Sequence, residues 1–149
     1  VDVGSSYVMS DVLAAFLFAQ LEQWKSIQAS RAAIWARYQE GLADWAVTQE
    51  IRPPVVPLHC DQTHHMYYLL MPTLEARTAF IAHLRAAGIL AVFHYLPLHT
   101  SDYARRWGNG PGDCPISEDV SDRLVRLPFY TSLRESDQFR VIYCIRSFR

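Results

Sequence analysis

The stretch HMYYLLMPTLEARTAFIAHLRAAGILAVFHYL, residues 65–96, gives the clearest indication of the fold of this chain. It begins with a mostly apolar run, which is typical of a strand buried on both faces. Its middle part reads as an amphipathic helix, since Thr73 can cap the N-terminus and Gly88 can end the helix. It closes with a second apolar run. The stretch therefore predicts a strand, a helix and a strand in a βαβ-like or split βαβ unit.

A long helix is expected before this unit. Apolar residues recur at helical spacing from Leu13 to Trp45, behind a possible N-cap at Ser10. One helix is therefore predicted to run to about Ala46, with a bend near Gly41. Such a helix would be roughly 50 Å long, whereas a chain of this size has a radius of gyration of only about 15 Å. We therefore expect something outside this chain to pack on the helix.

The remaining segments complete the expected fold class, an α/β (α+β) small domain. A loop rich in glycine, proline and asparagine is expected over residues 97–115, followed by a short helix from Ser117. A final helix is expected after Ser136. Its apolar side would consist of Phe139, Ile142, Tyr143 and Ile145. We predict a helical segment over residues 1–48 and a small domain over residues 49–149.

Composition excludes several classes of partner. Of the 149 residues, 50% are hydrophobic and 19% charged, with a formal net charge of −1. Because the arginines are dispersed, no basic face predicts a nucleic-acid partner. No apolar run reaches the ~20 residues that cross a bilayer, and no secretory leader is recognisable. The three cysteines form no CxxC pair, which is typical of reduced thiols in a cytosol. We therefore expect a cytoplasmic protein without a membrane partner. The chain begins Val-Asp-Val without a methionine, which suggests a piece of something longer.

Two stretches with histidines raise the question of a metal site. His94 and His99 are separated by Pro97, so they cannot share one helical face as the ligands of an HExxH motif do. The stretch HCDQTHH, residues 59–65, matches the spacing of no common zinc finger or zinc ribbon. No metal site is therefore predicted.

The stretch FHYLPLHT, residues 93–100, is the strongest candidate for ligand contact. It follows a predicted buried strand, and residues just beyond the carboxyl end of a strand are the usual site of ligand contact in open α/β units. Pro97 would stiffen this exit. Three side chains would then be held in a fixed geometry: His94, Tyr95 and His99. The alternative is that His94 and Tyr95 are satisfied residues at a strand edge, and spacing alone leaves both interpretations open.

Four blocks of sequence carry a resemblance to a known family: residues 1–22, 63–71, 88–108 and 123–133. In this order and at these distances they resemble the C-terminal part of the DegT/DnrJ/StrS family of sugar-nucleotide aminotransferases. These are fold-type I enzymes that depend on pyridoxal phosphate (PLP). The resemblance covers nearly the whole chain and implies the small C-terminal domain of such an enzyme.

The resemblance implies an activity and its partners. The expected reaction transfers an amino group from glutamate to C4 of a dTDP-4-keto-6-deoxyhexose, in the biosynthesis of surface polysaccharides such as O-antigen or common antigen. The family resemblance further implies a homodimer whose active sites use residues of both subunits. In this family PLP is bound by a lysine of a large domain that this chain lacks, so the chain alone is expected to bind no PLP and to be inactive.

The roles of the family's site residues carry over only in part. Ser6 stands where the family has an asparagine near the cofactor phosphate, which implies a cofactor-binding role for Ser6. Val8 replaces an arginine and cannot make its charged contact. The HYLPLH block implies that His94, Tyr95 and His99 contact the sugar nucleotide and do not act as the catalytic base. No catalytic residue is expected in this chain.

The alternative hypothesis is a free-standing binding or interaction module that kept the small-domain fold without the chemistry. The gene upstream of Val1 distinguishes the two hypotheses. A reading frame that continues upstream through a large domain with a Schiff-base lysine would exclude the module. A start codon directly before Val1 would exclude the fragment.

Lys25 is the only lysine of the sequence, and it lies beside Trp24 in the predicted long helix, where a solvated side chain is expected. We predict that the chain, mixed with PLP and reduced with borohydride, yields no stoichiometric adduct at Lys25 by mass spectrometry. An adduct at a ratio near one per chain would contradict this prediction.

Overall fold

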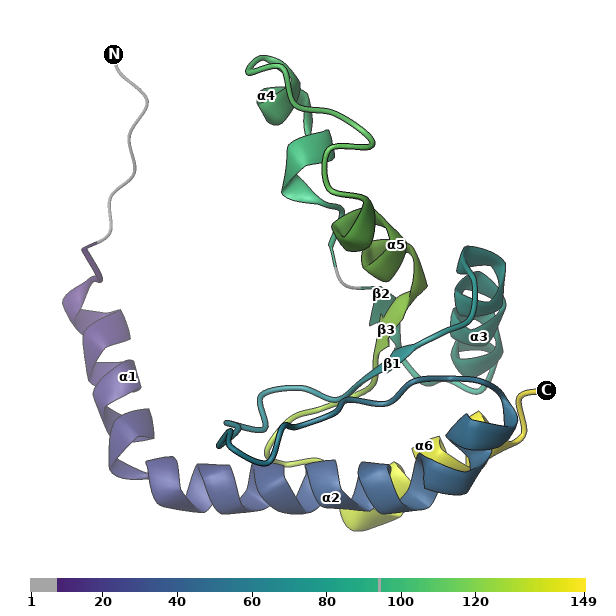
Figure 1. The fold of residues 1–149 in the computed structure, drawn as a ribbon. Helices are drawn as coiled ribbons and strands as arrows, with labels where there is room; N and C mark the ends of the chain where they lie inside the picture. Colours follow the sequence, from purple (N-terminus) through teal and green to yellow (C-terminus); the bar gives the residue numbers. More distant parts are fainter. Residues whose placement is uncertain (1–7, 94) are drawn as a thin grey trace.

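The chain runs through two helices before it reaches a small sheet (Figure 1). The computed structural model describes residues 8–93 and 95–149. The elements within these residues are α1 (Asp11–Glu22), α2 (Trp24–Thr48), β1 (Tyr68–Leu70), α3 (Leu74–Ala86), β2 (Val92–Phe93), η1 (Leu98–Thr100), α4 (Asp102–Arg105), α5 (Pro115–Arg123), β3 (Leu124–Arg126) and α6 (Glu135–Arg146).

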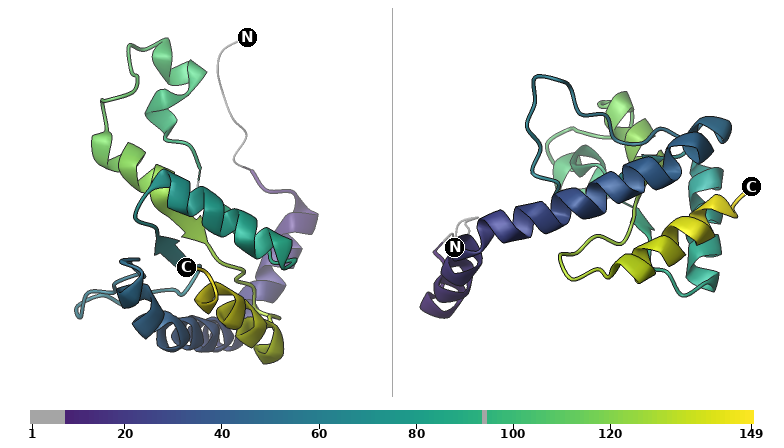
Figure 2. Two further views of the ribbon diagram at one scale, coloured as in Figure 1. Left: turned by 90° about the vertical axis from the view of Figure 1, so that its right-hand side faces the viewer. Right: turned by 90° about the horizontal axis from the view of Figure 1, so that it is seen from below.

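The N-terminal arm is bent between α1 and α2, as Figure 1 shows. The prediction of one helix with a bend near Gly41 is wrong, because the helix is interrupted at Gln23, whose φ and ψ are −101° and 10°. Gly41 lies inside α2 and has another role. A Cβ atom at this position would lie 2.9 Å from Cδ1 of Ile142 on α6. The missing side chain therefore allows α2 and α6 to pack closely, side by side (Figure 2).

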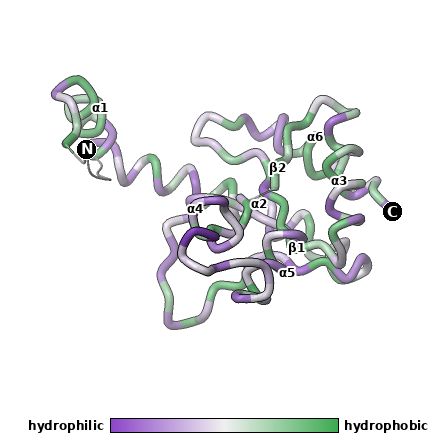
Figure 3. The backbone as a smooth tube through the Cα atoms, turned by 90° about the horizontal axis from the view of Figure 1, so that it is seen from above, coloured by the Kyte–Doolittle hydropathy of each residue, from purple (hydrophilic) through white to green (hydrophobic). Residues whose placement is uncertain are grey.

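Helix α1 is exposed along its whole length. None of its residues is buried, and Val12, Phe16 and Phe18 are 80%, 68% and 63% exposed. Figure 3 shows these apolar turns lying apart from the rest of the chain. Burial of one such side chain typically contributes ~1.5–3 kcal/mol. The exposed side chains thus support the expectation that something outside the chain packs on the arm. No helix in the described part of the chain is long and apolar enough to cross a membrane.

The described strands form one sheet in the order β1-β3-β2. Strand β3 is antiparallel to both neighbours, so β1 and β2 run parallel to each other. Helix α3 connects them in sequence, which confirms the predicted split βαβ unit. The strands are shorter than the predicted apolar runs, and the sequence analysis did not identify β3 as a strand.

The register of the strands sorts their side chains onto two faces. Leu69 and Val125 lie opposite each other and are fully buried on one face. Tyr68, Arg126 and Val92 form the adjacent row and therefore lie on the other face. Figure 2 shows α3 in front of the sheet, on one side of it only. Helix α3 thus covers the face that contributes to the core.

The core lies where α2, α3 and α6 meet the covered face of the sheet. Its large, fully buried side chains include Tyr38 on α2, Phe80 on α3 and Ile145 on α6. The Tyr38 hydroxyl donates to the carbonyl of Pro128 at 2.9 Å, so its polar atom is satisfied while its ring packs. Burial raises the pKa of Tyr38 above its ordinary value, and the hydroxyl keeps its proton.

Helix α6 packs on α2 with a side that differs in part from the predicted one. Ile142 and Ile145 are buried, as predicted. Phe139 and Tyr143, which were predicted on this side, are exposed. Gln138 and Val141 complete the buried side in their place. A polar residue can take this position only where its hydrogen bonds are satisfied inside the core.

Gln138 provides the test of this packing. Its Nε2 donates to the carbonyl of Ile34 at 2.7 Å, and its Oε1 accepts from Arg37. Gln138→Ala removes both bonds and leaves a cavity, so we predict a loss of about 2 kcal/mol in the free energy of unfolding, measured by urea denaturation. Ser136→Ala, at an exposed position of the same helix, is the control and should change that free energy by less than about 0.5 kcal/mol. Equal stability of the two variants would contradict the role of Gln138.

Candidate functional site

The predicted ligand-contact stretch leaves β2 and leads into a pocket beside α5. The pocket is open and has a volume of about 690 Å³. Its lining includes Tyr95, Leu98 and His99 from the strand exit, and Ile116 and Val120 from α5. An apolar lining with a few polar groups at its rim is typical of small-molecule sites. Two of the predicted site residues, Tyr95 and His99, are therefore brought together here.

Two other predicted site residues, Ser6 and His94, lie outside the described residues. Their predicted contacts with the cofactor and with the sugar nucleotide stay predictions.

Tyr95 is held at the rim of the pocket in an unusual backbone conformation. Its φ is 38°, in the left-handed region, which costs on the order of 1 kcal/mol for a residue other than glycine. The hydroxyl of Ser121 donates to the Tyr95 carbonyl at 2.7 Å. The guanidinium of Arg126 lies over the Tyr95 ring, with Cζ 5.5 Å from the ring centroid. These contacts hold a side chain that is 68% exposed.

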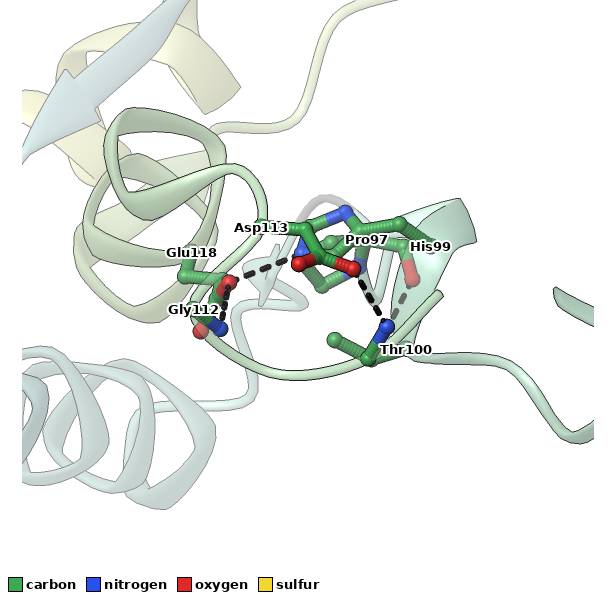
Figure 4. A network of polar contacts seen from close by, with 7 residues as sticks. Pro97, His99, Thr100, Gly112, Asp113 and Glu118 are labelled. Carbon is green, nitrogen blue, oxygen red and sulfur yellow. Dashed lines mark hydrogen bonds and ion pairs between the residues drawn. The ribbon is translucent and has the colours of Figure 1, made fainter. Parts of the chain in front are cut away.

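His99 lies deeper than Tyr95 and is tied to α5. Its Nε2 lies 2.8 Å from Oε1 of Glu118, and its side chain is only 13% exposed. The same oxygen of Glu118 accepts from the backbone N–H of Gly112 at 2.8 Å, as Figure 4 shows. Because a carboxylate only accepts hydrogen bonds, Nε2 of His99 carries a proton. The Nδ1 atom is left for a ligand, since it has no hydrogen bond among the described residues.

Sequence reasoning missed the residues that position Tyr95 and His99. Glu118 and Ser121 lie on α5, and Arg126 lies on β3. No short motif links these residues to the strand exit, because they come from a later part of the chain. The one available signal is a charged residue, Arg126, inside the apolar run LVRL.

The one lysine of the sequence, Lys25, does not line the pocket. Lys25 is exposed on α2, with Nζ 5.7 Å from the centroid of the Trp24 ring. A Schiff-base lysine needs an enclosed position beside groups that bind the cofactor, whereas the described residues leave Lys25 exposed. The described part of the chain also contains no group of three or more side chains that could hold a metal ion.

Comparison with known proteins decides the family. The model of the DegT/DnrJ/EryC1/StrS aminotransferase family matches residues 1–146. This chain belongs to that family. The pocket and the sheet described above are therefore parts of an aminotransferase fold.

Relatives within the family are longer than this chain. The dTDP-3-amino-3,4,6-trideoxy-alpha-D-glucose transaminase of Micromonospora megalomicea subsp. nigra is 28% identical over 145 residues, which cover 96% of this chain and 38% of that protein. The chain spans 38% of the length of the curated relatives it matches.

Solved structures show the same fold. An aminotransferase of the family from Brucella abortus is 31% identical, with a TM-score of 0.76 over 91% of this chain and 34% of that one. DesV from S. venezuelae, in complex with a ketimine intermediate, is 29% identical, with a TM-score of 0.79 over 89% of this chain and 34% of that one.

The contacts that Glu118 makes with His99 and with the backbone of Gly112 can be tested through their dependence on pH. Hydrogen bonds from His99 and from the backbone of Gly112 lower the pKa of Glu118 below its ordinary value of 4.5. The resulting stabilisation is complete above about pH 4.5 and is lost as the pH falls through the lowered pKa. We predict that Glu118→Gln lowers Tm near neutral pH, and that the difference from the wild type shrinks below about pH 4.5. Thermal unfolding between about pH 7 and pH 3 measures this, and a constant difference would contradict it.

Proposed function

We propose that this chain is the C-terminal part of a PLP-dependent sugar-nucleotide aminotransferase. The observation that carries the proposal is the family match over residues 1–146 in a chain that spans only 38% of its curated relatives. Its one lysine, Lys25, is exposed on α2. The proposal therefore assigns the Schiff-base lysine and the acid that pairs with the cofactor to a large domain on the remainder of the protein.

The proposed reaction transfers an amino group from glutamate to C4 of a dTDP-4-keto-6-deoxyhexose, in surface polysaccharide biosynthesis. Within the family, we propose the dTDP-4-amino-4,6-dideoxygalactose transaminases as the group of the parent enzyme, because the four sequence blocks resemble them. The name of the Micromonospora relative, a dTDP-amino-sugar transaminase, supports this class of substrate. PLP would carry the amino group between the two substrates, which no side chain of this chain can do.

The part of the site that this chain supplies is a rim for the sugar nucleotide. Tyr95 is 68% exposed at the rim, and a tyrosine hydroxyl can donate or accept a hydrogen bond with a sugar hydroxyl or a phosphate. His99 presents Nδ1, while Glu118 holds its other nitrogen. In the same proposal His94 contacts the sugar nucleotide and Ser6 contacts the cofactor phosphate.

The complete protein is proposed to be a cytoplasmic homodimer. Helix α1 supports this part of the proposal, because none of its residues is buried within the described chain. Its apolar side chains provide a surface on which the rest of the protein and a second subunit can pack.

The full-length protein tests the proposal. Supplied with PLP, glutamate and a dTDP-4-keto-6-deoxyhexose, it should form the 4-amino sugar nucleotide and 2-oxoglutarate in equal amounts, both measured by mass spectrometry. The chain of residues 1–149 alone is the matched control and should form neither. Product from the control would contradict the assignment of the lysine to the remainder of the protein. If the full-length protein binds PLP but forms no product, the proposed substrate is wrong.

A further inference from the structure

Arg126 is a partly buried cation at the centre of the sheet. Its Nε atom is buried and has no hydrogen-bond partner in the described part of the chain. None of the ion pairs between described residues includes it. Withdrawing a charge from water is costly unless a partner compensates it. The position therefore calls for an anion that this part of the protein does not contain.

Two other arginines near the sheet differ from Arg126. Arg123 also has a buried Nε, but its other nitrogens donate to the carbonyl of Met71 at 3.2 Å and to the carboxylate of Asp119. Arg77 has a buried Nε and lies over the ring of Phe93, 5.3 Å from its centroid, but it comes from α3 on the covered side of the sheet. Only Arg126 lies beside the pocket rim.

The register of β3 turns Arg126 away from the core. Its neighbour Val125 is fully buried, and Arg126 lies between Tyr68 and Val92 on the opposite face. Figures 1 and 2 agree that α3 lies on the other side of the sheet. The ring of Tyr95 contacts Arg126 on this face, and the Tyr95 backbone is left-handed, with a φ of 38°. Arg126 and the pocket rim are thereby joined through one aromatic ring.

The contact with the Tyr95 ring does not pair the N–H donors of Arg126 with an anion. A cation–π contact engages the charge of the guanidinium, whose five N–H donors lie in the guanidinium plane. Those donors match the two oxygens of a carboxylate or a phosphate in a bidentate contact. The cation–π contact also fixes the orientation of the guanidinium before a ligand arrives.

We propose that Arg126, oriented by the Tyr95 ring, is an oxyanion-binding residue at the edge of the pocket. The ligand group is a phosphate or a carboxylate. This group belongs either to the diphosphate of the sugar nucleotide or to a carboxylate of the amino-acid donor. The choice of these two sources rests on the proposed function. Both groups accept two parallel N–H bonds from one arginine.

The test uses the full-length protein and two simple anions. Inorganic diphosphate and glutarate are titrated separately, by calorimetry, into the wild type, Arg126→Gln and Arg77→Gln. Arg126→Gln should weaken binding of one anion by about 10- to 100-fold, as expected for the loss of a charge-assisted pair. Arg77→Gln loses the same charge and a similar cation–π contact on the other side of the sheet, and should change binding by less than about threefold. The anion that is affected identifies the source.

Several results would overturn the proposal. These are unchanged anion binding in Arg126→Gln, an equal loss in Arg77→Gln, or an Asp or Glu of the remaining chain paired with Arg126 in a structure of the complete protein.

If Arg126→Gln does not fold, Arg126→Met keeps a long apolar stem against Tyr95. Its Tm without anion should then match or exceed that of the wild type, and neither anion should raise it. An anion-dependent rise equal to that of the wild type would also overturn the proposal. Failure of the proposed function is distinguishable, because it would leave anion binding intact and amino-sugar product absent.

Discussion

Strand β3 holds the sheet together by pairing with both of its neighbours. Strands β1 and β2 do not pair with each other, so β3 supplies the hydrogen bonds that join them. Because side chains alternate along a strand, Val125 enters the core and Arg126 faces the other way. A slip of one residue would exchange them and place a charge in the core, which the cost of burying an unpaired cation prevents. The same register therefore specifies the core and the edge of the pocket.

The position of β3 also determines where α5 lies. Helix α5 ends at Arg123 and β3 begins at the next residue, so no loop uncouples the two elements. Helix α5 carries Ser121, which holds the backbone of Tyr95, and Glu118, which holds the side chain of His99. The candidate site is thus assembled from a strand exit and a later helix, and the middle strand sets the distance between them.

Family membership and fold are consistent with a chain that is one part of a larger enzyme. The core is formed by α2, α3, α6 and the sheet, whereas α1 contributes no buried residue to it. The family model matches nearly the whole chain, although the chain spans only 38% of its curated relatives. The exposed apolar side chains of α1 and the uncompensated charge of Arg126 are both features whose partners the described residues do not supply.

Features that depend on neighbouring residues could be predicted from the sequence. The N-cap at Thr73 is present, with the Ala76 N–H bonded to its hydroxyl at 3.2 Å, and Gly88 ends α3 with a φ of 71°. Both depend on residues within one helical turn, so spacing and residue type predict them. The burial of Gln138 and the position of Arg126 over the Tyr95 ring follow from the packing of distant segments. These positions depend on partners far away in the sequence, and hydrophobic spacing carries no information about which distant group will satisfy a buried polar atom.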